Sequence, residues 1–359
     1  MDASKHGQGY GIMKEITREN IWKQEEYTYE AAYGFMPNLR FYLHDDSDAK
    51  STCQEPSSSS KSTGPRPFML VVPGGGYCMA VPPEGEVVAK VFYEKGMNCA
   101  VLTYTTDITM SVPLRKQPMN DISRAVRYIR KNAERLAADP GKLIVCGFSA
   151  GAHVCGSLGV HFEEITDPDP DLNPVSNRPD AMILSYPVIT SGEFTHIYSM
   201  WALLGQDGPK EEYEYFSLEK HVKENTPPTF MWQTVTDDLV PVENSMMFAS
   251  ALRKAGVPFS YHAFPQGFHG LSVFNEDWKN GNFGEPYTME QVDLAVKAVK
   301  EGRGVRVPEQ RVKELKEQFP DPDPNGEKPE PPQMPPLPNL KDVPMWPDLA
   351  MAFFEQIFS

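Results

Sequence analysis

The sequence predicts an α/β protein whose mostly parallel central sheet carries helices on both faces. Short apolar runs alternate with amphipathic segments along residues 67–160, and this alternation is typical of parallel strands joined by helices. Residues 147–151 read Gly-Phe-Ser-Ala-Gly between an apolar run and a helix-compatible segment. Such a turn lifts a serine hydroxyl out of the chain at the edge of a sheet.

The individual elements follow from apolar periodicity. Segment 120–137 repeats Ile, Val, Ile, Ala and Leu at helical spacing with Asp121 near its start, whereas segment 259–264 alternates like a strand. Strands are expected at 39–44, 67–72, 99–104, 142–147, 181–186, 229–234 and 259–264, and helices at 84–95, 120–137 and 149–160.

The 359 residues suffice for one large α/β domain with additions, or for two small domains. We expect an N-terminal extension with the first strands and a serine-rich loop (Ser51 to Ser62) in 1–66, the core in 67–272, an insertion in 273–342, and the C-terminal helix of the core in 343–359.

The insertion is predicted to hold helices at 289–301 and 309–318, followed by a proline-rich stretch at 320–347. Proline at this density excludes a helix or sheet interior, so we expect an extended surface arm. An active-site rim and a dimerisation arm stay open as alternatives.

Ser149 is the candidate nucleophile, and a serine needs a base, an acid and oxyanion donors to react near neutral pH. The expected chain order is serine, acid, histidine. His269 lies in Gly-Phe-His-Gly, after the strand at 259–264, and is the candidate base. His262 lies within that strand, and His153, one turn beyond Ser149, is expected to pack against the helix.

Asp237 and Asp238 follow the strand at 229–234, and both lie beyond its end. Residue pattern alone leaves the acid open between them. The acid fixes the histidine tautomer and stabilises the imidazolium.

Three consecutive glycines follow the strand at 67–72, in Pro-Gly-Gly-Gly-Tyr at 73–77. The backbone N–H groups of Gly75 and Gly76, with that of Ala150 after the nucleophile, are the predicted oxyanion donors. A phosphate loop is the alternative, but the Lys-Ser/Thr ending and the G-x-G-x-x-G spacing are absent.

Composition excludes several functions. The net charge of −15 argues against nucleic acid and anionic membranes as partners. No apolar run of membrane-spanning length exists, and the N-terminus lacks a secretory signal, so a cytoplasmic location is expected.

The five cysteines form no C-x-x-C pair, so we expect no metal and no cofactor. A homo-oligomer stays possible.

Four motifs together resemble the esterase branch of the α/β-hydrolase superfamily, which includes the hormone-sensitive-lipase-like and acetylxylan-esterase-like enzymes. These are the glycine motif at 73–77, the serine motif at 147–151, Asp-Asp-Leu-Val-Pro at 237–241 and Gly-Phe-His-Gly at 267–270. The resemblance implies an α/β-hydrolase fold and assigns the acid to Asp237, the first residue of D-x-x-V-P. Pro73 replaces the histidine that usually opens the glycine loop in the lipase-like branch.

The resemblance further implies hydrolysis of short acyl esters, with acetyl groups on xylo- or manno-oligosaccharides as the leading substrate. Tyr77, Phe268 and Trp201 are candidate substrate contacts, although core packing explains each of them equally well. A small-molecule carboxylesterase, an exopeptidase of the same fold and a non-catalytic binding protein on this scaffold are the alternatives.

Overall fold

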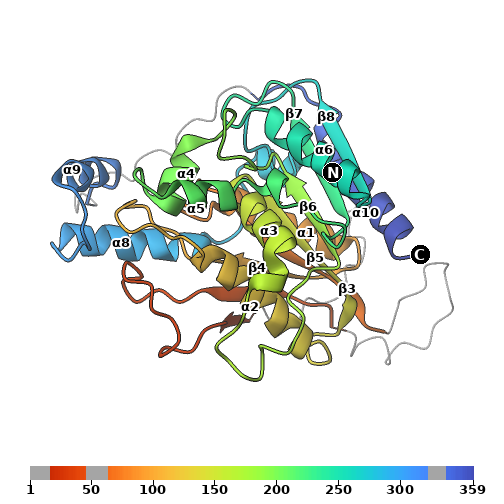
Figure 1. The fold of residues 1–359 in the computed structure, drawn as a ribbon, viewed down its shortest axis with the longest axis horizontal. Helices are drawn as coiled ribbons and strands as arrows, with labels where there is room; N and C mark the ends of the chain where they lie inside the picture. The colour runs from red at the N-terminus through yellow and green to blue at the C-terminus, as the bar shows by residue number, and fades with distance from the viewer. Residues whose placement is uncertain (1–16, 46–63, 322–336) are drawn as a thin grey trace, which may run out of the picture.

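A computed structural model describes residues 17–45, 64–321 and 337–359. Its eight-stranded sheet has the order β1-β2-β4-β3-β5-β6-β7-β8. β1 pairs with β2 and β2 with β4 in antiparallel fashion, and every pair from β4 to β8 is parallel. Figure 1 shows the sheet running through the molecule with helices on either side. The predicted mostly parallel sheet with helices on both faces is therefore confirmed.

The strands are β1 (Arg18–Asn20), β2 (Asn38–Tyr42), β3 (Arg66–Val72), β4 (Asn98–Thr103), β5 (Ala138–Phe148), β6 (Ala181–Ser185), β7 (Thr229–Thr234) and β8 (Phe259–Phe264). The α-helices are α1 (Glu86–Glu94), α2 (Gln117–Lys131), α3 (Ala150–His161), α4 (Ile197–Leu204), α5 (Lys210–Tyr215), α6 (Glu243–Ala255), α7 (Glu276–Lys279), α8 (Glu290–Lys300), α9 (Glu309–Gln318) and α10 (Trp346–Ile357).

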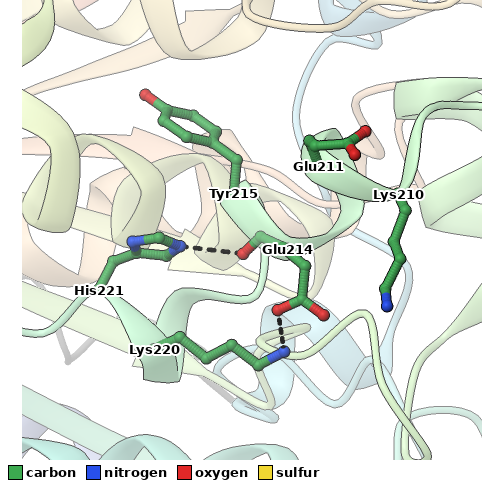
Figure 2. A pocket seen from close by; sticks show the side chains of 6 residues that line it. All are labelled: Lys210, Glu211, Glu214, Tyr215, Lys220 and His221. Atoms are coloured by element: carbon green, nitrogen blue, oxygen red, sulfur yellow. Dashed lines mark hydrogen bonds and ion pairs between the residues drawn. The ribbon is translucent and has the colours of Figure 1, made fainter.

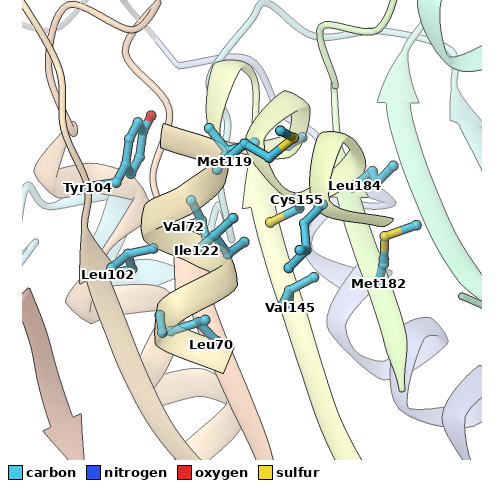
Figure 3. Packing of buried hydrophobic residues seen from close by; sticks show 14 of the residues in the cluster. Leu70, Val72, Leu102, Tyr104, Met119, Ile122, Val145, Cys155, Met182 and Leu184 are labelled. Carbon is cyan, nitrogen blue, oxygen red and sulfur yellow. The ribbon is translucent and has the colours of Figure 1, made fainter. Parts of the chain in front are cut away.

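Alternate residues of the central strands enter two separate cores because side chains along a strand point to opposite faces. On β3, Leu70 and Val72 pack with α2, α3 and α6, whereas Met69 and Val71 pack with α1 and α10. Figure 3 shows the first core, where Ile122 of α2 and Cys155 of α3 lie over the strands. Each central strand is thus buried on both faces. Only the ends of these strands reach the surface of the sheet layer, so the loops at their carboxyl ends are where side chains can meet a ligand.

The predicted strands at 229–234 and 259–264 have the observed bounds. The helix expected at 120–137 instead ends at Lys131. The side chain of Asn132 donates to the Tyr128 carbonyl at 2.8 Å, and the chain then turns so that Ala138 can pair with Arg66 of β3. The end of α2 is therefore set by the pairing of β5 with β3, which the apolar spacing within the helix does not reveal.

The insertion after the histidine motif forms α8 and α9, as predicted. These helices share a small core with Ile108 and Met79, two residues beyond the glycine motif. The predicted serine-rich loop and residues 322–336 of the proline-rich stretch lie outside the described residues. Beyond them, Leu337 and Leu340 pack against the α10 core. None of the helices within the described ranges combines the length and the apolar character needed to cross a bilayer.

Candidate active site

Ser149 lies between β5 and α3 on a turn that requires glycine on both sides. Its φ is +52° and its ψ −118°, a conformation that a residue with a side chain rarely adopts. A Cβ on Gly147 would lie 2.4 Å from the Gly151 carbonyl oxygen, and one on Gly151 would lie 2.2 Å from that of Val72. Only glycine fits at both positions, so the local sequence places the serine at the carboxyl end of β5.

His269 connects Ser149 to an aspartate. Its Nε2 lies 2.8 Å from Ser149 Oγ, and its Nδ1 lies 2.8 Å from Asp237 Oδ2. Because a carboxylate only accepts hydrogen bonds, Nδ1 carries the proton, and Nε2 is left to accept from the serine hydroxyl. The ring is therefore held in the tautomer that a general base needs.

The loop after β7 orients the two aspartates differently. Asp237 Oδ1 accepts from the backbone N–H groups of Leu239 and Val240 at 3.0 and 2.9 Å. Asp237 is also 3.3 Å from the Gln233 amide nitrogen, and its side chain is 1% exposed. Asp238 Oδ1 instead accepts from the backbone N–H of His269 at 3.1 Å. Asp237 thus meets the imidazole, and Asp238 holds the backbone of the histidine.

The glycine loop, residues 73–77, lies beside the serine. Gly75 has φ +125° and Gly76 φ +64°. Within the described residues, the N–H groups of Gly75, Gly76 and Ala150 have no hydrogen-bond acceptor. Gly74 N–H is taken by Glu84 Oε2 at 2.7 Å. Three backbone donors next to Ser149 are therefore available to a ligand oxygen.

Tyr77 closes the glycine loop but is 1% exposed. Its hydroxyl lies 2.6 Å from Nδ1 of His153, whose Nε2 donates to the Phe216 carbonyl at 2.9 Å. Burial lowers the pKa of His153 to about 4, so the ring is neutral and its Nδ1 accepts a hydrogen bond from the Tyr77 hydroxyl. The predicted substrate contact at Tyr77 is therefore not supported, because its polar end is turned into the core. His153 packs in the core as expected.

The other two candidate contacts are only partly buried. Phe268 packs against the α10 core beside His269. Trp201 lies on α4, with its ring centroid 5.3 Å from that of Tyr198, which is 61% exposed. Partial exposure leaves Phe268 and Trp201 able to contact a ligand. His262, the rival base, lies on β8, where its Nε2 is 2.9 Å from Ser260 Oγ.

His196 is a residue that the sequence did not single out. Its Nδ1 lies 2.7 Å from the Oγ of Ser199, and that Oγ would be 3.8 Å from a Cβ on Gly76. Burial and then the positive charge of His269 lower the pKa of His196, whereas Asp237 raises it. The N-cap residue of α4 therefore brings a second imidazole to the site. Its position 73 residues before His269 in sequence gave no signal of this.

No group of three or more His, Cys, Asp or Glu side chains suited to a metal occurs within 17–45, 64–321 and 337–359. A surface hollow of about 560 Å³ lies away from the triad residues, on α5 and the following turn (Figure 2). There Lys220 pairs with Glu214, and His161 and Lys116 cover the Tyr215 ring at 3.9 and 4.3 Å. Both faces of this ring are occupied, so it offers no stacking surface.

Among known proteins, the chain is similar to esterases and to proteins named for xylan. It is 56% identical over 282 residues to endo-1,4-beta-xylanase B of Butyrivibrio fibrisolvens, covering 79% of this chain and 42% of that protein. It is 30% identical over 235 residues to an acetylxylan esterase of Xylanibacter ruminicola, covering 64% and 45%. The chain thus spans less than half the length of these curated relatives.

Solved structures give the same picture. An acetyl ester-xyloside bifunctional hydrolase from Caldicellulosiruptor lactoaceticus aligns with a TM-score of 0.64 at 33% identity, over 77% of this chain and 97% of that one. The carboxylesterase Cest-2923 from Lactobacillus plantarum, at 22% identity and TM-score 0.57 over 80% and 98%, shares the fold. The model of the BD-FAE family matches residues 57–252. The chain therefore belongs to the BD-FAE family of α/β-hydrolase esterases.

Proposed function

We propose that this protein is a serine esterase that removes short acyl groups, above all acetyl, from xylo- or manno-oligosaccharides. One observation carries the proposal: Ser149, His269 and Asp237 form a continuous hydrogen-bonded chain beside three backbone N–H groups that have no acceptor within the described residues. A nucleophile, its base, the orienting acid and oxyanion donors are the groups that acyl transfer requires.

Acylation begins when Ser149 Oγ attacks the ester carbonyl carbon and its proton passes to His269 Nε2. Asp237 keeps the proton on Nδ1 and stabilises the imidazolium without accepting that proton. The developing oxyanion is held by the N–H groups of Gly75, Gly76 and Ala150. When the tetrahedral intermediate collapses, His269 protonates the alcohol oxygen, and the carbon–oxygen bond of the ester breaks.

Deacylation repeats these steps with water. His269 Nε2 takes a proton from a water molecule, and the hydroxide attacks the acyl carbon bound to Ser149. The same three N–H groups hold the second oxyanion. Collapse returns the proton to Ser149 Oγ and releases the carboxylic acid, so the enzyme is restored without a cofactor.

A carbohydrate alcohol is favoured by residues at α4 and its N-terminal end. His196, the N-cap residue of α4, supplies an imidazole near the triad. The exposed Tyr198 and the partly exposed Trp201 supply aromatic surface on the helix itself. Hydroxyl-rich sugars bind through hydrogen bonds together with contacts to aromatic rings. The names of the xylan-related relatives support the same substrate class.

The decisive experiment measures acetate release from acetylated xylo- and manno-oligosaccharides by the wild type and by Ser149→Ala. We expect release by the wild type and a loss in kcat on the order of 10⁶-fold in the variant, the scale seen when a triad serine is removed. Reducing ends are counted in parallel to report cleavage of glycosidic bonds, for which we expect no increase.

Fluorophosphonate labelling provides the control for the serine itself. The wild type should be labelled once at Ser149, and Ser149→Ala should stay unlabelled while keeping the same melting temperature. Acetate release that survives Ser149→Ala would refute the mechanism. Labelling without release from either oligosaccharide, but with cleavage of p-nitrophenyl acetate, would keep the mechanism and reject the carbohydrate substrate.

A further inference from the structure

A buried glutamate that the proposed mechanism does not use lies behind the nucleophile. Glu84 ends the one-turn 3₁₀ helix Pro82–Glu84, and it is 3% exposed. A Cβ on Gly74 would lie 2.9 Å from both Glu84 Oε2 and the Cβ of Ser149. The carboxylate is therefore separated from the nucleophile by a single glycine. Burying a charge costs free energy unless hydrogen bonds compensate it, so the partners of Glu84 and its role at this place need an explanation.

The two oxygens of Glu84 bind two different parts of the site. Oε2 accepts from the N–H of Gly74 at 2.7 Å, and Oε1 accepts from the hydroxyl of Tyr186 at 2.7 Å. The Tyr186 oxygen in turn accepts from the N–H of Ser272 at 3.1 Å. Because a carboxylate can only accept, the tyrosine proton points to Glu84. The Gly74 N–H and the Tyr186 hydroxyl thus donate to the carboxylate, and the Ser272 N–H donates to the Tyr186 oxygen.

This chain joins the glycine loop to the histidine loop, which we define as residues 265–272. Gly74 directly precedes the oxyanion donors Gly75 and Gly76, and Ser272 follows His269 by three residues. The Tyr186 ring also packs edge-on against the His269 ring, with centroids 4.8 Å apart. Tyr186 itself has φ +35°, which is unusual for a residue with a side chain and is maintained by these contacts.

We propose that Glu84 is a positioning residue that fixes the oxyanion donors and the base relative to each other, acting through Gly74 on one side and Tyr186 on the other. The proposal rests on the proposed esterase function. It assigns to Glu84 no proton transfer and no contact with substrate. Its effect is geometric, since a misplacement of about 1 Å between catalytic groups costs roughly 10²-fold in rate.

The surroundings of Glu84 act on its pKa in opposite directions. Its titratable neighbours are Tyr186, Tyr104, Cys146 and His269. Burial raises the pKa of Glu84, while hydrogen bonds from Tyr186 and Gly74 and the charge of His269 lower it. Both oxygens of Glu84 accept hydrogen bonds, as a buried carboxylate requires.

Glu84→Gln tests this positioning role with little change in volume. An amide offers one acceptor and one donor group, so whichever way it turns, either Gly74 or Tyr186 loses its acceptor. With p-nitrophenyl acetate we expect kcat to fall about 10- to 100-fold and KM to stay nearly constant. Titration with a fluorophosphonate counts the folded, reactive sites.

Tyr186→Phe keeps the ring against His269 but removes the link to Ser272. It should also lower kcat while KM stays nearly constant, because the loss is one of geometry at the reacting groups. The double variant should be no slower than Glu84→Gln alone. Tyr186→Phe also carries the test by itself if Glu84→Gln fails to fold.

Glu86→Gln is the matched control. Glu86 is also buried, but it accepts from the Tyr42 hydroxyl at 3.1 Å and pairs with Lys90 at 2.6 Å, away from both loops. Its kcat and KM should equal those of the wild type. A wild-type kcat in Glu84→Gln, a rise in KM that accounts for the whole loss, or an equal loss of kcat in Glu86→Gln would overturn the proposal. Ser149→Ala tests the esterase function separately, so the two failures are distinguishable.

Discussion

Both carboxylate oxygens of Asp237 face the same ring nitrogen of His269, at 2.8 and 3.1 Å from Nδ1. One of them, Oδ1, is also held by two backbone N–H groups. The neighbouring Asp238 faces the backbone of the same histidine instead. Asp237 is therefore placed to orient the imidazole ring, and Asp238 is placed to hold the backbone of the same histidine.

Asp237→Asn should lower kcat by about 10⁴-fold, because an amide beside Nδ1 no longer fixes the catalytic tautomer. Asp238→Asn keeps an oxygen that can accept from the His269 N–H and should lower kcat by less than about tenfold. Steady-state kinetics on p-nitrophenyl acetate compares the two. Equal losses, or the larger loss in Asp238→Asn, would contradict the assignment of Asp237 as the acid.

Gly75→Ala should lower kcat by about 10²- to 10³-fold, the cost of losing an oxyanion donor. The new Cβ would lie 2.4 Å from the Met79 carbonyl oxygen at a φ of +125°, so the N–H must turn away. Gly34→Ala is the control, because Gly34 also has positive φ but its Cβ would meet nothing within 4 Å. It should lose some stability and keep its kcat. Unchanged kcat in Gly75→Ala would remove this loop from the proposed oxyanion site.

His153 should make the fold less stable in acid. Burial lowers its pKa to about 4, against about 6.5 for an ordinary histidine. Between these values the unfolded chain binds a proton that the folded chain does not, so stability falls as the pH falls. The loss should reach about 3 kcal/mol below pH 4.

Asp121 works in the opposite direction, because burial raises its pKa to about 6 and the folded chain takes up its proton first. The measurement is therefore a difference: the free energy of unfolding from pH 7 to pH 4 for the wild type and for His153→Gln. The wild type should lose more stability across this range than the variant. Parallel curves would show that His153 does not titrate as expected.

His196→Gln should raise KM for acetylated xylo-oligosaccharides by about tenfold while kcat for p-nitrophenyl acetate stays within about twofold. The reason is that His196 is expected to bind the sugar alcohol, which the small ester lacks. His262→Gln is the control, since that histidine also contacts a serine hydroxyl, that of Ser260, but lies on β8. Equal changes in KM and kcat for both substrates would show that His196 does not bind the alcohol part of the substrate.

Short-range pattern predicted the framework correctly where the local signal was strong. The strands at 229–234 and 259–264 and the helix at 309–318 have the bounds expected from the sequence. The strand–serine–helix turn also follows from local rules, because glycine is the only residue type that fits at positions 147 and 151. The predicted end of α2 at residue 137 was wrong, because β5 must begin at Ala138, where it can pair with β3.

The sequence by itself determined the fold class and the chemical types at the site, because apolar periodicity and glycine positions are local properties of the chain. The resemblance of the D-x-x-V-P motif assigned the acid to Asp237, and Asp237 is the aspartate that meets the imidazole. The tertiary structure alone decided that Tyr77 turns into the core and that Glu84 meets Tyr186 from 102 residues away. These contacts arise where the carboxyl ends of parallel strands bring distant loops together, and buried polar groups must find partners there. No pattern within a window of sequence carries that information.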